Sequence, residues 1–109
     1  MATFFRNEVV KNVGTIPVKV IETNATQRAT VIGLSFTNLT DKFVYVNVEL
    51  QSQDSARGFY LKDSVLPQGT SLRAVSTGEK LILATNNAMY VSCSLDDAVD
   101  VIISYVEIT

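Results

Sequence analysis

The chain has 109 residues, of which 47% are hydrophobic and 18% charged, a balance that excludes a disordered chain and predicts one globular domain. Nine basic and eleven acidic residues give a net charge of −2, which excludes the strongly basic surface typical of nucleic-acid binding. Because Cys93 is the only cysteine, no internal disulfide can form, and the fold must be stabilised by packing.

The first part of the chain reads as short strands separated by polar turns. Residues 1–13 are interpreted as an N-terminal strand or arm, and residues 14–109 as the folded domain. The segment 17–21 begins with a proline, which is typical of an edge strand or of the first residue of a strand. The segment 30–38 is a longer strand, in which Gly33 predicts a bulge or a close backbone approach.

Two later segments show which faces are apolar. The strand around residues 43–50 alternates, with one apolar face and one mixed face; the apolar face consists of Val44, Val46, Val48 and Leu50. The last strand, residues 99–108, is apolar on both faces, so it is either central in a sheet or covered by a second chain. Only residues 95–98 have a pattern compatible with a helical turn.

Turn-forming residues recur about every ten residues along the chain, which is the spacing of β-sandwiches and barrels. The predicted turns lie at residues 23–26, 38–41, 67–70, 76–78 and 86–87. The segments 60–63, 80–83 and 89–93 add further short strands between these turns. The pattern therefore predicts an all-β fold, a single jelly-roll-like or Greek-key β-sandwich of about eight antiparallel strands.

The residue types exclude most catalytic sites. The chain has no histidine, so neither a Ser-His-Asp nor a Cys-His arrangement can exist, and one cysteine cannot build a zinc site. Cys93 shares a strand face with Met89 and Val91, which indicates a core position. We therefore expect a protein that is not an enzyme and that uses no cofactor.

Carboxylates offer two weaker possibilities. Asp96 and Asp97 are adjacent and point to opposite faces in a strand, so they are a poor pair for glycoside hydrolysis. Together with Asp100 they could supply oxygen ligands to calcium, but the order of an EF-hand loop is absent. We expect no metal site.

Two segments are candidate partner contacts. Phe4 and Phe5 precede Arg6, and on a strand only one of the two rings can face the core, which leaves the other as an anchor unless the fold covers both. At the other end of the chain, all nine Lys and Arg lie at or before residue 80, so the segment with Asp96, Asp97 and Asp100 is acidic. It is either a solvated loop or a patch for a basic partner surface.

Several strand and turn sequences resemble those of small virion proteins of tailed bacteriophages. They are Tyr-Leu-Lys-Asp at residues 60–63, where the family has a Tyr-Leu-x-Lys-type strand, a Pro-x-Gly-x-Ser-Leu turn at 67–72, a Lys-Leu-Ile-Leu strand at 80–83 and a closing strand at 98–108. The strand 30–38 also fits. The family places Pro-Gly-Asp after the third strand, whereas this chain has Ala84, Thr85, Asn86 and Asn87 there.

The resemblance implies a non-enzymatic part of a virion that works as symmetric copies. We expect a capsid decoration or cement protein, a dimer or trimer that binds the major capsid protein or other virion proteins. A neck, collar or baseplate component that attaches tail fibres is one alternative, and a carbohydrate- or host-surface-binding module is another. No bilayer-spanning run and no secretory signal are visible, so we expect folding in the host cytoplasm, a final location in the virion and no membrane partner.

Overall fold

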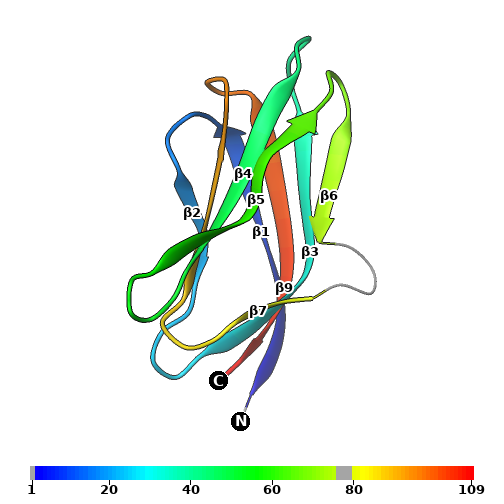
Figure 1. The fold of residues 1–109 in the computed structure, drawn as a ribbon. Helices are drawn as coiled ribbons and strands as arrows, with labels where there is room; N and C mark the ends of the chain where they lie inside the picture. The colour runs from blue at the N-terminus through cyan, green and yellow to red at the C-terminus, as the bar shows by residue number, and fades with distance from the viewer. Residues whose placement is uncertain (1, 76–79) are drawn as a thin grey trace.

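The structure, a computed structural model, describes residues 2–75 and 80–109 and contains nine strands and no helix within those ranges (Figure 1). The predicted turn at residues 76–78 lies outside the described residues. The strands are β1 (Thr3–Val13), β2 (Val18–Glu22), β3 (Arg28–Asn38), β4 (Val44–Gln51), β5 (Arg57–Leu66), β6 (Ser71–Val75), β7 (Leu81–Leu83), β8 (Ala88–Cys93) and β9 (Val99–Ile108).

The strands form two antiparallel sheets that face each other. Sheet A has the order β1-β9-β3-β6, with β7 also paired to β3, and sheet B has the order β2-β8-β4-β5. β7 pairs with β3 from Ala29 to Val31 and β6 pairs with it from Leu34 to Thr37, so the two share one strand position. Eight positions in this order form a jelly roll, which confirms the predicted all-β sandwich.

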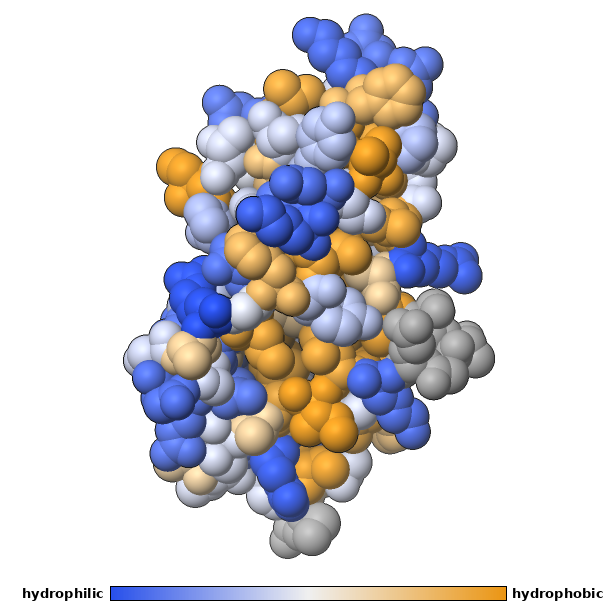
Figure 2. All heavy atoms as spheres, in the orientation of Figure 1, coloured by the Kyte–Doolittle hydropathy of each residue, from blue (hydrophilic) through white to orange (hydrophobic). Residues whose placement is uncertain are grey.

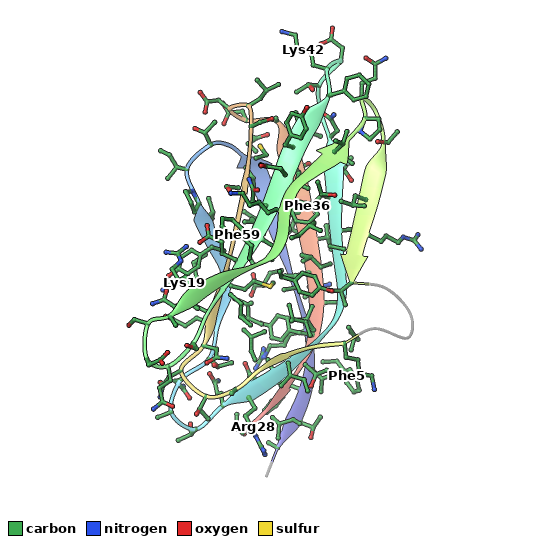
Figure 3. All side chains as sticks on the ribbon, viewed as in Figure 1. Phe5, Lys19, Arg28, Phe36, Lys42 and Phe59 are labelled. Atoms are coloured by element: carbon green, nitrogen blue, oxygen red, sulfur yellow. The ribbon has the colours of Figure 1, made fainter. Side chains whose placement is uncertain are left out.

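The core lies between the sheets and follows the period-two alternation. Val44, Val46 and Val48 are fully buried, as the apolar face of that strand predicted. From sheet A, Phe36 is also completely buried and lies between the two sheets (Figure 3). Each such side chain stabilises the fold by about 1.5–3 kcal/mol through removal of apolar surface from water.

The position of each strand in its sheet tests several predictions made from the sequence. β2 is an edge strand, as the proline before it predicted, and the pairing of β3 with β9 shifts register between Val31 and Gly33. β9 is central, between β1 and β3, yet its outward side chain Ile102 remains 47% exposed. Residues 95–98 form a turn rather than a helix. The last strand is therefore both central in its sheet and open on one face.

A buried asparagine at the end of β3 organises two loops. The Asn38 side-chain nitrogen donates to the carbonyl oxygens of Lys42, Leu66 and Pro67 at 2.8, 3.0 and 3.1 Å. Its side-chain oxygen accepts from the backbone N–H and the hydroxyl of Thr40, both at 2.8 Å. These bonds tie the β3–β4 loop to the turn after β5.

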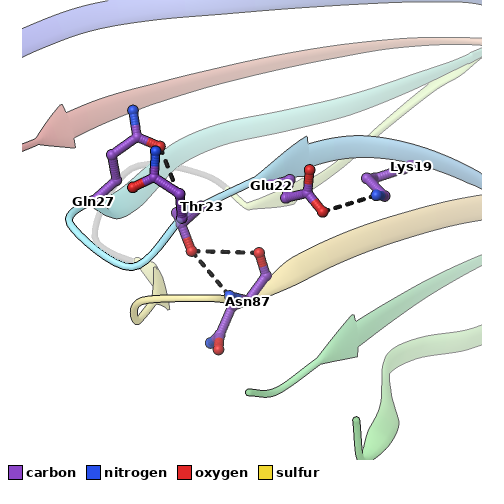
Figure 4. Close-up of polar contacts among 6 residues, drawn as sticks. Lys19, Glu22, Thr23, Gln27 and Asn87 are labelled. Atoms are coloured by element: carbon purple, nitrogen blue, oxygen red, sulfur yellow. Dashed lines mark hydrogen bonds and ion pairs between the residues drawn. The ribbon is translucent and has the colours of Figure 1, made fainter. Parts of the chain in front are cut away.

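A second buried polar group joins the loops at the opposite end (Figure 4). The Thr23 hydroxyl donates to the carbonyl of Ala84 at 2.5 Å and accepts from the backbone N–H of Asn87 at 3.0 Å. The Thr23 backbone N–H also donates to the carbonyl of Asn87 at 2.9 Å. Because these groups lie away from water, their mutual hydrogen bonds hold the loop after β2 against the start of β8.

Candidate interaction surface

The predicted contact residues fall into two groups at opposite ends of the long axis of the molecule. Phe4 pairs with Glu107 near the end of β9, whereas Asp100 lies at the start of β9. Figure 1 shows the two termini at one end of the sandwich and the β8–β9 turn at the other. The structure therefore does not bring the aromatic and acidic candidates into one site.

The N-terminal aromatic pair splits between the two faces of β1. Phe5 lies on the outer face of sheet A and is 81% exposed, while Phe4, 42% exposed, points the other way. The guanidinium of Arg6 lies 5.0 Å from the centre of the Phe4 ring, and the Arg6 Nε atom is 3.3 Å from a carboxylate oxygen of Glu107. Arg6 thus partly covers Phe4, and Phe5 is the open ring.

Two of the three acidic candidates have hydrogen-bond partners within the chain. An Asp96 carboxylate oxygen accepts from the Thr15 hydroxyl at 3.0 Å, and one of Asp100 accepts from the backbone N–H of Asn12, also at 3.0 Å. Asp97 adopts a φ of 51°, which indicates a tight turn. Within residues 2–75 and 80–109, no group of three or more His, Cys, Asp or Glu side chains is placed to hold a metal ion.

The outer face of sheet A carries a broad apolar surface. Its exposed side chains come from four strands, and we call this set the apolar face: Phe5 and Val9 of β1, Ile32 of β3, Ile82 of β7 and Ile102 of β9. The strand register places Val9 beside Ile102. A hollow between Phe5 and Ile32 is lined by the small polar residues Asn7 and Ser104 and also by Arg6, Glu8 and Tyr105.

Only parts of this face can be predicted from the sequence. The two apolar sides of β9 and the exposure of one N-terminal ring were visible as alternation. The pairing of β1 and β3 with β9, and of β7 with β3, joins residues that are up to a hundred positions apart. No local pattern therefore shows that these side chains share one surface.

Sheet B has a different outer face, on which charges interrupt the aromatic side chains. Arg57 lies 3.3 Å from the carboxylate of Glu49, and its guanidinium lies 3.9 Å from the centre of the Tyr90 ring. The ammonium of Lys62 lies 4.9 Å from the Phe59 ring centre. In the view onto β4 and β5, polar residues surround separate apolar areas, and the widest apolar area lies around β7 (Figure 2).

Cys93 is buried, which confirms its predicted core position. Its side chain is 4% exposed, its Sγ atom donates to the carbonyl of Leu95 at 3.0 Å, and burial raises the pKa of the thiol above its ordinary value. The folded state thus favours the protonated thiol. The free energy of unfolding therefore falls as the pH rises above the pKa that the Cys93 thiol has in the unfolded chain.

We expect Cys93 to react with a thiol reagent such as dithionitrobenzoate at pH 8 at least about 100-fold more slowly in the native protein than in urea, because only the unfolded thiol is accessible. Absorbance kinetics in the two solvents measure the ratio. Equal rates would contradict the buried position and would make a disulfide between two copies feasible.

Removal of residues 1–5 is expected to leave a cooperatively folding domain, since none of the described residues in this segment belongs to the core. The loss of strand pairing between Thr3–Phe5 and the end of β9 should cost about 1–2 kcal/mol. Circular dichroism during urea unfolding measures this, and a binding assay should show weaker partner association. An unfolded truncation would show that the segment is required by the core.

The fold and this surface define a jelly-roll domain with one open sheet face, and the same fold occurs in proteins of two ordered assemblies. A subunit from the structure of Bacillus endospore appendages, which form disulfide-linked pili, aligns with a TM-score of 0.59 at 8% identity over 98% of this chain and 88% of its own. A chain of the T13 particle of infectious bursal disease virus aligns with a TM-score of 0.54 at 10% identity.

These similarities concern the fold, because the identities are low. This chain covers 96% of its own length in the alignment to the bursal disease virus chain but only 30% of the length of that protein. No protein-family model and no curated protein matches the sequence. In the described ranges, no helix is long and apolar enough to cross a membrane.

Proposed function

We propose that this chain is a non-enzymatic structural subunit of a bacteriophage virion, a capsid decoration protein that stabilises the shell through symmetric protein–protein contacts. The observation that carries the proposal is the apolar face, which exposes side chains of four strands. Exposed apolar side chains gathered on one sheet face are typical of protein–protein contact in folded domains. The sequence resemblance to small phage virion proteins supports the choice of assembly.

The shape and chemistry of the domain are consistent with such a role. It measures 45 × 27 × 22 Å. Phe5, the most exposed of its large apolar side chains, offers an anchor for a neighbouring protein. The use of the jelly roll in a viral particle and in endospore appendages shows that this fold supports ordered assemblies.

Two other functions remain as alternatives. A neck, collar or baseplate component would use the same surface in fewer copies. A carbohydrate- or host-surface-binding module is favoured by one observation, the exposed Phe43 and Tyr45 side chains on the outer side of sheet B. Aromatic faces of this kind stack on sugar rings, but Lys62 already covers part of the nearby Phe59 ring.

Binding to shells tests the proposal. Purified chain is added to particles from a phage that lacks its gene, and the bound fraction is measured after pelleting. We expect saturation at one copy per capsid subunit or a simple fraction of it, and release of the genome at a higher temperature once the chain is bound. Absence of binding, or binding that soluble glycans abolish, would contradict a decoration role.

A further inference from the structure

We infer that the apolar face is a two-fold interface between two copies of this chain, stacked face to face with their strands antiparallel. The area of the face, its distribution of charge and the symmetry of its rows support this arrangement. A dimer would bury the face on which the proposed function rests, and the capsid would then contact other surfaces of the domain. The dimer does not depend on capsid binding, so the two proposals can fail separately.

The area is sufficient for a stable dimer. Strands β1 and β3 are 11 residues long and β9 is 10. At about 3.4 Å per residue and about 4.8 Å between strands, four strand positions give a face of roughly 650 Å² before side-chain relief is counted. Specific interfaces bury about 600–1,000 Å² on each partner.

Charge is absent from the middle of the face. The outward positions of β1, β9 and β3 between its two ends carry only apolar or small polar residues. Charged side chains lie at the border: Arg28 at one end, Lys11 and Asp100 at the other, and Arg73 on β6. A charge-depleted centre with a polar rim is the composition of a protein interface, whereas sheet B carries the Arg57–Glu49 ion pair on its outer side.

The rows across the strands have an approximate two-fold pattern. A central row of small residues consists of Asn7, Ser104 and Gly33. The row on one side runs through Phe5, Val106, Thr30 and Ile82, and the row on the other runs through Val9, Ile102, Ser35 and Arg73. The two rows therefore match across β1 and β9 but differ at the position shared by β6 and β7. A two-fold axis that runs along the central row, between the two sheets, places the first row of one copy opposite the second row of the other. The small residues of the central row let the two sheets approach to about 10 Å.

The rim charges favour the antiparallel orientation. Arg28 pairs with Ile108 at one end of the face, and Asp100 pairs with Thr37 at the other. Antiparallel stacking therefore places Arg28 of each copy at the end that holds Asp100 of its partner. Parallel stacking would instead bring the two Arg28 side chains together, which is unfavourable.

Sedimentation equilibrium of the purified full chain tests this interface with matched variants. We expect the wild-type chain to be a dimer and Val9→Glu to raise the dimer dissociation constant on the order of 100-fold, because each interface would bury two unpaired carboxylates. Val65→Glu is the control, since Val65 is similarly exposed, at 50% against 60% for Val9, but belongs to β5 in sheet B. That variant should stay within about threefold of wild type.

Cross-linking tests the orientation. Under mild oxidation Ser104→Cys should form a disulfide-linked dimer, because residue 104 lies on the two-fold axis. Arg28→Cys should not, because antiparallel stacking keeps the two copies of residue 28 at opposite ends. The reverse pattern would establish parallel stacking and overturn the antiparallel interface.

A wild-type chain that stays monomeric at all concentrations would overturn the inference, as would equal effects of Val9→Glu and Val65→Glu. A monomer that still saturates capsid shells would remove the dimer and leave the decoration role. A dimer that does not bind shells would remove the decoration role and leave the dimer interface.

Discussion

Replacement of Asn38 by aspartate is expected to lower the free energy of unfolding by about 3–5 kcal/mol, the largest effect of any polar substitution we predict in this domain. The wild-type side-chain nitrogen donates to three carbonyl oxygens, and Asn38 is only 3% exposed. An aspartate places a carboxylate oxygen against those carbonyls, where it must either remain charged without a donor or bind a proton. Urea unfolding monitored by circular dichroism measures the loss.

Asn47→Asp is the matched control. The Asn47 side-chain oxygen accepts from the backbone N–H of Asp63 at 2.8 Å, and a carboxylate keeps that bond. Among the residues that the structure describes, its nitrogen donates to the Ser92 hydroxyl alone, at 3.5 Å, and a bond of this length contributes little. We expect a change below about 1 kcal/mol. Equal losses in the two variants would show that the Asn38 contacts do not hold the loops together.

Phe36→Ala is expected to cost about 3–5 kcal/mol, because it removes the largest fully buried side chain of the core and leaves a cavity. Phe36 lies on β3, whose neighbours β9 and β6 are held by backbone pairing, so the site can collapse only in part. The midpoint of urea unfolding should fall while the slope of the transition changes little.

Phe43→Ala provides the comparison for this cavity. Phe43 is 66% exposed just before β4, so the same change of side chain should alter the free energy of unfolding by no more than about 0.5 kcal/mol. If both variants lost the same stability, the assignment of Phe36 to the core and of Phe43 to the surface would be wrong.

The sequence predicted most of the fold because period-two alternation reports burial directly. The valines of β4, the proline before β2 and the register shift at Gly33 all lie where local patterns placed them. The number of strands differed, since β6 and β7 share one position beside β3, and no local signal distinguishes one broken strand position from two separate ones.

The surface was less predictable for a physical reason. Asn38 was visible only as a turn residue, although its side chain binds carbonyls almost thirty residues away. The segment with Asp96 and Asp100 was predicted to be either a solvated loop or a patch for a basic partner, and in the structure both side chains also hold residues 12–15 within the chain. Phe5, by contrast, is 81% exposed and is accessible to a partner. Local periodicity predicts which face of the sheet a side chain points to. The neighbours of that side chain depend on the long-range register between strands.

The measurement that tests the proposed role most directly is the copy number of this chain in purified virus particles, determined by quantitative mass spectrometry against the major capsid protein. The proposal predicts one copy per capsid subunit, or a simple fraction of it, as symmetric decoration of a shell requires. A total of about a dozen copies per particle would place the chain in the neck or tail. Its absence from particles would contradict a virion role altogether.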